Sequence, residues 1–178
     1  MKKTTLLGVM AGLCLWVSAQ QQTIQPLTVG DTVPDITFTH LINYPNKTAK
    51  LSDFKGKVVI LDFWFTTCTG CIRDFPKLQE IQATHPTDVQ IILVAHETKE
   101  KVSQFIKNWE KKNNTQFSLP IVTDDTLLHN LIRHTYEGHL AWISPQGRLL
   151  AQSSPSILNL EVMTAYLNIL RKEKQLNQ

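Results

Sequence analysis

An apolar run that leads directly into a closely spaced cysteine pair constrains the fold of this chain more than any other feature. Residues 58–65 are apolar except for Asp62, and Cys68-Thr69-Gly70-Cys71 follows within a few residues. Such a run is typical of a central strand buried on both faces. Apolar residues then recur at every third position, which predicts a helix over 71–83 with a kink at its internal proline (Ile72, Phe75, Leu78, Ile81; Pro76).

The remainder of the chain alternates patterns that are typical of strands and helices. Strands are predicted at 36–39, 89–95 and 121–122, and helices at 102–109, 127–132 and 160–170. Ser144-Pro145-Gln146-Gly147 is typical of a type I turn, so residues 140–143 and 149–151 are expected to form a hairpin. This order predicts an α/β domain of three layers, in which helices flank a central mixed sheet.

The first residues have the composition of a secretory signal. Lys2 and Lys3 precede an apolar run over 6–17, and Val17-Ser18-Ala19 supplies the small residues of a cleavage site. The run is shorter than the roughly 20 residues that span a bilayer, although an uncleaved anchor is the alternative. We therefore expect a signal peptide at 1–19, a lead-in at 20–29, a domain at 30–172, a tail at 173–178, and export to the periplasm.

Charge and cysteine content narrow the function of the mature chain. Lys2 and Lys3 are two of 18 Lys and Arg residues against 15 Asp and Glu, so the exported form is nearly neutral. It offers no electrostatic case for nucleic acid or an anionic membrane as partner, and no membrane span. Cys14 lies within the signal, which leaves Cys68 and Cys71. A disulfide between them closes a very small loop and adds little stability, so a chemical role explains the pair better.

The position of the pair indicates how it would react. Cys68 is expected at a helix N-terminus, where unpaired backbone N–H groups and the helix dipole favour a thiolate. Cys71 lies one turn along, so Cys68 would be the nucleophile and Cys71 the resolving thiol. Two alternatives stay open, a zinc site shared with His129 and His134 and an inert disulfide, although the long separation from His129 disfavours zinc.

Three segments of the sequence resemble the thioredoxin superfamily. The segment 62–71 resembles its active-site strand and loop, and 30–35 (GDTVPD) and 51–57 (LSDFKGK) are similar to the lead-in of its TlpA/ResA-like branch. The resemblance covers residues from about Gly30 to the last helix. It implies a thioredoxin-like fold, no cofactor and no metal, and disulfide exchange with protein dithiols and disulfides. It also implies a membrane or periplasmic electron donor and a reductive direction.

The resemblance assigns roles to several side chains. Asp62 matches a buried acid six residues before the nucleophile. In an apolar strand its pKa should rise, so it would relay a proton to or from Cys71; the alternative is a carboxylate satisfied by backbone donors. Trp64 matches a tryptophan that packs beneath the loop. Glu97 matches an acidic residue near the cysteines, although a Glu at a helix start is equally explained by the helix dipole.

The expected substrate-facing residues are Trp64, Thr69, Gly70, Gly138 and His139, and some depart from the family pattern. The usual Pro before the second cysteine is Gly70, and the usual Trp before the first is Thr67. The cis-proline that faces the disulfide in the family is replaced by Gly138, which cannot enforce a cis bond but permits unusual backbone angles. His139 beside it would then be a third metal ligand or a polar residue at a strand start.

Other classes of function remain as alternatives. A peroxiredoxin would need Pro and Thr or Ser where this chain has Leu61 and Phe65. A thioredoxin-fold copper chaperone would use thiolates with an imidazole, but related chaperones carry three residues between their cysteines, not two. A third alternative is an interaction module that keeps the fold but no longer catalyses disulfide exchange. The replacement of the cis-proline by Gly138 is the feature that favours it.

Overall fold

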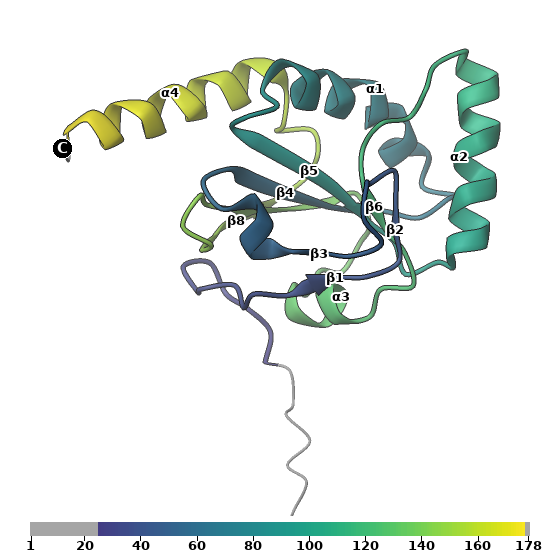
Figure 1. Ribbon diagram of the computed structural model, residues 1–178, viewed down its shortest axis with the longest axis horizontal. Coiled ribbons are helices and arrows are strands. Elements are labelled where there is room, and N and C mark those ends of the chain that lie inside the picture. The colour runs from purple at the N-terminus through teal and green to yellow at the C-terminus, as the bar shows by residue number, and fades with distance from the viewer. Residues whose placement is uncertain (1–24, 177–178) are drawn as a thin grey trace, which may run out of the picture.

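The computed structural model describes residues 25–176 of the chain (Figure 1). The strands are β1 (Thr37–Phe38), β2 (Leu41–Ile42), β3 (Ala49–Lys50), β4 (Val58–Phe63), β5 (Val89–Val94), β6 (Ile121–Val122), β7 (His139–Ile143) and β8 (Leu149–Ser153). The helices are the 3₁₀ turn η1 (Leu51–Phe54) and the α-helices α1 (Thr69–Thr84), α2 (Lys99–Asn113), α3 (Leu127–Leu131) and α4 (Leu160–Leu176). The predicted signal peptide at 1–19 lies outside the described residues.

A mixed sheet forms the middle of the domain. Its strand order is β2-β6-β5-β4-β7-β8, in which β4, β5 and β6 run parallel while β2, β7 and β8 run antiparallel to their neighbours. A separate two-stranded sheet pairs β1 with β3. Every residue of β4 and β5 is buried, as expected for strands covered on both faces. The predicted three-layer α/β fold with a central mixed sheet is confirmed.

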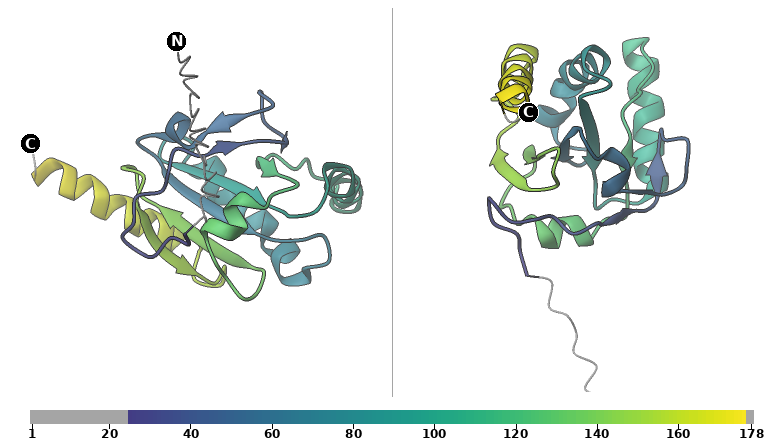
Figure 2. Two further views of the ribbon diagram at one scale, coloured as in Figure 1. Left: turned by 90° about the horizontal axis from the view of Figure 1, so that it is seen from below. Right: turned by 60° about the vertical axis from the view of Figure 1, so that its left-hand side comes forward.

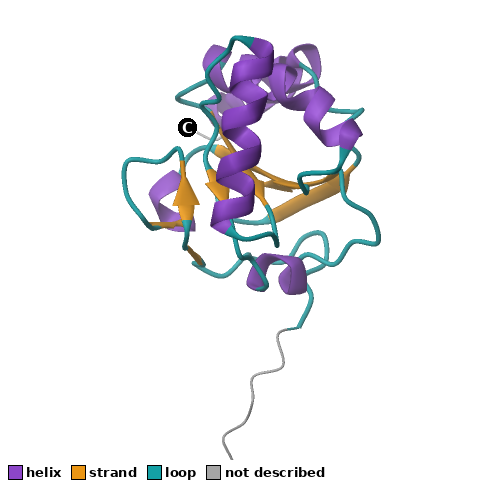
Figure 3. Cartoon of the chain, turned by 90° about the vertical axis from the view of Figure 1, so that its right-hand side faces the viewer, coloured by secondary structure: helices purple, strands orange, loops and turns teal. Residues whose placement is uncertain are grey.

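Each face of the sheet has its own apolar core. Alternate residues of β4 point to opposite faces, so Ile60 packs with α1, α2 and α4, whereas Leu61 packs with η1, α3 and the N-terminal segment. Figure 2 shows the three long helices along one face and α3 on the other. Figure 3 shows the same separation, with the short α3 below the strands. The helical layers hold the sheet between them and leave its edges and loops accessible.

Helix boundaries follow local capping interactions. The Cys68 side chain accepts a hydrogen bond from the backbone N–H of Cys71, so α1 begins at Thr69, two residues before the predicted start. Thr98 caps α2 in the same manner, and Asn114 ends it in the left-handed conformation with φ 48°. The helix α4 continues through Leu176, into the stretch expected to be a tail.

None of the helices within residues 25–176 is both long enough and apolar enough to cross a membrane.

Candidate active site

One edge of the central sheet gathers the loops that carry the predicted site. Phe63 at the end of β4 is in register with Val94 of β5 and with His139 at the start of β7. The loops that leave β4 and β5 and the loop that enters β7 therefore meet at this edge. They carry the cysteine pair, Glu97 and Gly138, which lie far apart in the sequence. Carboxyl ends of parallel strands are a common position for binding sites in α/β proteins.

A disulfide joins the two cysteines at the N-terminus of α1. The S–S distance is 2.04 Å, and the Cα atoms of Cys68 and Cys71 lie 5.4 Å apart. The Cys68 N–H donates to the carbonyl of Phe65, closing a turn between β4 and the helix, and the Cys71 N–H donates to Cys68 Sγ over 3.2 Å. That N–H group is one that the helix leaves unpaired, so it is available to stabilise a Cys68 thiolate.

The two cysteines differ in accessibility. Cys68 is partly exposed, whereas Cys71 is 2% exposed and belongs to the core under α1. An external thiol or disulfide can therefore reach the sulfur of Cys68 but not that of Cys71. Thr69 and Gly70 between them are exposed, and a side chain at Gly70 would meet open space. This asymmetry matches the predicted division into nucleophile and resolving thiol.

Glu97 holds the loop that precedes Cys68. Its carboxylate accepts hydrogen bonds from the backbone N–H of Thr66 over 2.6 Å and from the Thr66 hydroxyl over 2.8 Å, and Lys101 Nζ lies 2.6 Å from its Oε1. Burial raises the pKa of Glu97, but the hydrogen bonds from Lys101 and Thr66 outweigh burial, so the pKa falls below its usual value. Glu97 acts on the cysteine loop through Thr66, a role that the helix dipole does not explain.

Asp62 is a buried carboxyl group without a hydrogen-bond partner. It is 1% exposed, and neither oxygen has a partner among the described residues, so the alternative of backbone donors is not observed. Strand alternation places it on the same face as Ile60 and Trp64, the face that α1 covers. Burial, followed by the charge of Asp74, raises its pKa well above the usual value, as predicted.

Trp64 supports the site from below. It is fully buried, and its ring packs edge-on against Phe75 of α1 at 5.0 Å and at a tilt against Phe105 of α2 at 5.6 Å. Because none of its surface is exposed, Trp64 fixes the base of the cysteine loop and does not offer a contact to a substrate. Its place in the structure agrees with a packing role and differs from the expected substrate-facing one.

Gly138 faces the disulfide across the edge of the sheet. A Cβ built on it would lie 3.5 Å from Cys71 Sγ, so the backbone itself forms this wall of the site. Its φ is +77°, a conformation that L-residues with side chains rarely adopt, and its N–H donates to the carbonyl of Phe63. No cis peptide bond occurs within residues 25–176, so Gly138 replaces the family's cis-proline with a trans bond.

His139 points away from the cysteines. It is 8% exposed, its Nε2 lies 2.8 Å from Gln152 Oε1, and its ring stacks on His134 at 4.9 Å. It follows the alternation of β7 onto the face of Phe63, opposite to that of Cys71. The expectation that His139 contacts substrate or joins the cysteines as a metal ligand is therefore not met by its position, because strand geometry turns its ring to the other face.

Sequence reasoning missed a group of titratable residues behind Gly138. His96 lies 3.8 Å from Glu137, and His129 lies 3.7 Å from the same carboxylate. Burial lowers the pKa of His129, but the neighbouring carboxylates of Asp125 and Glu137 outweigh burial and raise it to about 9. Burial raises the pKa of Glu137, whereas the neighbouring His129 lowers it below its usual value overall. The sequence suggested His129 only as a ligand shared with the cysteines, and no local motif links it to His96, which lies 33 residues earlier.

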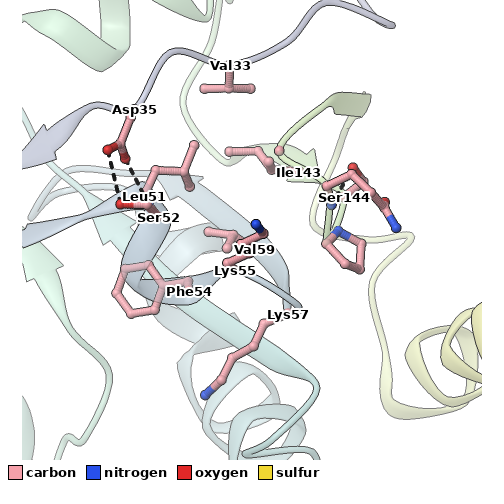
Figure 4. Close-up of a pocket in the computed structure, with 13 residues that line it drawn as sticks. Val33, Asp35, Leu51, Ser52, Phe54, Lys55, Lys57, Val59, Ile143 and Ser144 are labelled. Carbon is pink, nitrogen blue, oxygen red and sulfur yellow. Dashed lines mark hydrogen bonds between the residues drawn. The ribbon is translucent and has the colours of Figure 1, made fainter.

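Two hollows lie at different distances from the disulfide. A pocket of about 240 Å³ is lined by Val59 at the start of β4 and by Lys55, at the end of the strand opposite to Cys68 (Figure 4). An open, mainly apolar depression of about 410 Å³ lies instead beside the start of α1, between Thr69 and the α2 residues Phe105 and Trp109. Only the second hollow adjoins the cysteine loop.

The family of the chain is indicated by a match that includes the whole site strand and both cysteines. Residues 28–130 match the family model described as Redoxin. Thiol-disulfide oxidoreductase ResA of Geobacillus kaustophilus is 29% identical over 103 residues, covering 58% of this chain and 56% of the relative. The ResA protein of Bacillus thuringiensis is 34% identical over 90 residues, covering 49% and 50%. The chain thus spans about half the length of these curated relatives.

A solved structure shows the same fold. A putative protein disulfide isomerase from Bacteroides thetaiotaomicron superimposes with a TM-score of 0.61 at 22% identity, covering 82% of this chain and 89% of that one. At this identity the likeness supports the fold. The geometry of the cysteine pair must supply the argument for chemistry.

Proposed function

Since this chain belongs to the Redoxin family, we propose that it is a thiol–disulfide oxidoreductase that exchanges disulfides with proteins through Cys68 and Cys71. The observation that carries the proposal is the asymmetry of the pair, a partly exposed sulfur at a helix N-terminus bonded to a buried one. The names of the two ResA relatives support the same chemistry.

The first half-reaction begins from the reduced dithiol. The Cys68 thiolate attacks one sulfur of a substrate disulfide, so a Cys68–substrate bond forms, the substrate S–S bond breaks, and the other substrate sulfur leaves as a thiolate that takes up a proton. The backbone N–H of Cys71 lies where it can donate to the attacking thiolate. The open depression beside Thr69 leaves room for a substrate segment next to Cys68.

The second half-reaction releases the substrate. Cys71 loses its proton and attacks Cys68 Sγ, so the Cys68–Cys71 bond forms, the mixed disulfide breaks, and the second substrate thiol departs. Two electrons have then passed from the dithiol to the substrate. We assign Asp62 as the group that accepts the Cys71 proton, because a raised pKa makes the ionised carboxylate a stronger base than an ordinary aspartate.

We further propose that the reaction runs in the reductive direction outside the cytoplasm, with a membrane or periplasmic donor restoring the dithiol. The support for export is the sequence of residues 1–19, where Lys2 and Lys3 precede an apolar run that ends in Ala19. The preference for reduction comes from the resemblance to the TlpA/ResA-like branch.

No feature of the site favours peroxide reduction or copper delivery over disulfide exchange. Leu61 and Phe65 occupy the positions at which a peroxiredoxin carries Pro and Thr or Ser, so the proline and the hydroxyl are lacking. His139, which would complete a thiolate–imidazole site, lies on the other face of the sheet. Disulfide exchange needs only the two sulfurs and a proton acceptor, all of which are present.

Trapping of mixed disulfides tests the proposal. The Cys71→Ser variant should accumulate Cys68–substrate adducts with a disulfide-containing protein such as insulin, because the attack that releases the substrate is lost. The Cys68→Ser variant should form no adduct and should lose insulin reduction. Thr67→Ser, a neighbouring hydroxyl variant, is the control and should behave as wild type. Full activity in either cysteine variant would contradict the mechanism.

A further inference from the structure

Three side chains from separate segments present metal-ligand atoms to one point beside the site. His96 follows β5, His129 belongs to α3, and Glu137 directly precedes Gly138. One ligand atom from each lies within 4.8 Å of the ligand atoms of the other two. His96 Nδ1 lies 3.8 Å and His129 Nε2 lies 3.7 Å from Glu137 Oε1. The group lies on the face of the sheet opposite to Cys71, so it is distinct from the cysteine pair.

A neighbouring carboxylate fixes the orientation of His129. Asp125 Oδ2 lies 2.7 Å from His129 Nδ1, and the two Asp125 oxygens also accept from the backbone N–H groups of Leu128 and His129. With Nδ1 engaged by Asp125, Nε2 is the nitrogen that can bind a metal ion, in place of the proton that it otherwise carries, and it is buried with no hydrogen-bond partner among the described residues. Carboxylates that hold the far nitrogen of a histidine in this manner are typical of metal sites, where they orient the ring.

The second carboxylate oxygen of Glu137, Oε2, also faces a histidine nitrogen, as Oε1 does. His134 Nδ1 lies 2.8 Å from the carbonyl of Ile132, which requires the hydrogen on Nδ1, and its Nε2 faces Glu137 Oε2 at 3.6 Å. Glu137 Oε2 is buried and has no hydrogen-bond partner within residues 25–176. Nε2 of both His129 and His134 thus faces the Glu137 carboxylate. The carboxylate favours a positive charge between them, carried by the His129 proton or by a metal ion that replaces it.

We propose that His96, His129 and Glu137 form a binding site for a divalent transition-metal ion, with zinc as the ion that fits the donors. In a tetrahedral zinc site with bonds of about 2.0–2.1 Å the ligand atoms lie about 3.3–3.4 Å apart. Closure therefore requires each histidine nitrogen to move roughly 0.4 Å closer to Glu137 Oε1, and the two nitrogens, which lie within 4.8 Å of each other, to approach by up to roughly 1.4 Å. Imidazole and carboxylate donors suit zinc and its neighbours better than magnesium or calcium. The exposed side of His96 leaves a fourth position for water.

The site would link the two walls of the cysteine groove. His96 is next to Glu97, which holds the loop before Cys68, and Glu137 is next to Gly138, which faces Cys71. A bound ion would therefore tie together the loop after β5, the helix α3 and the residue that precedes Gly138. The cysteines themselves are not ligands in this proposal.

Zinc titration of the disulfide-bonded protein, prepared without a polyhistidine tag, tests the site. We expect one zinc ion per chain by equilibrium dialysis, with a rise in the melting temperature. His96→Asn, which alters an exposed side chain, and Glu137→Gln should each weaken binding by at least about tenfold, and Asp125→Asn by about 10–100-fold through its effect on His129. His40→Asn, an exposed histidine elsewhere, is the matched control and should leave affinity unchanged.

A cysteine-free variant separates this site from the cysteine pair. Cys68→Ser with Cys71→Ser should bind zinc as tightly as the disulfide-bonded protein, and its cobalt complex should lack the intense near-ultraviolet band of thiolate ligation. Absence of stoichiometric zinc binding would overturn the proposal. Binding of unchanged affinity in both His96→Asn and Glu137→Gln, or loss of binding in the cysteine-free variant, would overturn it as well.

Discussion

At the scale of single residues, Asp62 has the environment least like that of an ordinary carboxyl group. Its two oxygens lie in an apolar core with no hydrogen-bond partner among the described residues, and burial raises its pKa. A buried ionised carboxylate without a partner is costly, and this cost favours the protonated form. Because burial makes the ionised carboxylate unfavourable, the ionised form of Asp62 binds a proton strongly. This property suits Asp62 to accept the proton of Cys71.

Asp62→Asn is predicted to change the pH dependence of stability. The folded state holds the proton of Asp62 more tightly than the unfolded state. The stability that Asp62 contributes is therefore fully present below the ordinary aspartate pKa of 3.8 and is lost as the pH rises through the raised pKa of the folded state. As the pH rises from 3.8 through the raised pKa, the urea midpoint of the disulfide-bonded wild type should therefore fall relative to that of the variant. Asp53→Asn, at an exposed carboxylate, is the control; identical profiles for wild type and Asp62→Asn would contradict the argument.

The same variant should slow the release of substrate. Without an acceptor for the Cys71 proton, resolution of a preformed Cys68 mixed disulfide should slow on the order of 10²-fold near neutral pH, since positioned acid–base groups contribute rates of this size. Stopped-flow measurement of resolution separates this step from the attack by Cys68, which should change little. An unaltered resolution rate would remove Asp62 from the mechanism.

Glu97 is predicted to act by positioning the loop. Glu97→Ala should lower the free energy of unfolding by at most about 1.5–3 kcal/mol for each charge-assisted hydrogen bond that is lost. It should also reduce the rate of attack by Cys68, because Thr66 loses both of its contacts with the carboxylate. Glu97→Gln keeps a carbonyl acceptor for Thr66 and should restore most of the rate. Glu100→Gln, in the first turn of the same helix, is the control. Equal attack rates for Glu97→Ala and wild type would exclude the positioning role.

At the scale of elements, the strand–loop–helix unit around the cysteines was predictable from local pattern. Continuous apolar character identified β4, and threefold spacing of apolar residues identified α1. The start of α1 was missed by two residues, because the capping residue is Cys68 and cysteine is not a standard capping residue. The strand β1 lies within the predicted strand at 36–39, whereas β2 and β3 are two residues each, too short for periodicity to reveal them.

Gly138 provides a test at this scale, since it belongs to the loop that enters β7. Gly138→Ala should destabilise the protein by about 1–2 kcal/mol because of its φ of +77°. The added Cβ would lie at an ordinary contact distance of 3.5 Å from Cys71 Sγ, so the fold should persist. Gly138→Asn should cost less, because asparagine tolerates left-handed angles. Equal denaturant midpoints for wild type and Gly138→Ala would contradict the assigned backbone strain.

At the scale of the whole molecule, the fold class could be predicted from the order of strands and helices. Which side chains meet at the edge of the sheet beside the cysteines could not be predicted in full. Register places the ends of β4 and β5 beside the start of β7, so Cys68, Glu97 and Gly138 meet as the resemblance implied. The same register brings His96, His129 and Glu137 together. The zinc alternative raised from the sequence joined His129 and His134 to the cysteines and did not include His96 or Glu137. Strand alternation places the His139 side chain on the face opposite to Cys71. This alternation cannot be assigned before the strand pairing is known.

The proposed export of the chain through a cleaved signal peptide leads to a separate prediction. Expressed from its first codon in a bacterial host, the chain should be recovered in the periplasmic fraction with Gln20 as its N-terminal residue, because Val17-Ser18-Ala19 supplies the small residues that signal peptidase selects. Fractionation followed by N-terminal sequencing measures both. Ala19→Arg should block processing. Recovery of uncleaved, soluble cytoplasmic chain would contradict export.

The reduction potential of the Cys68–Cys71 pair tests the central claim most directly. Equilibration with defined thiol buffers, read by mass spectrometry after alkylation, should give a two-electron couple between about −300 and −200 mV, the range of thioredoxins and glutaredoxins that pass electrons to protein disulfides. A value near −120 mV would identify an oxidant and contradict the reductive direction. A bond that stays closed well below about −300 mV would identify a structural disulfide and contradict the proposed function itself.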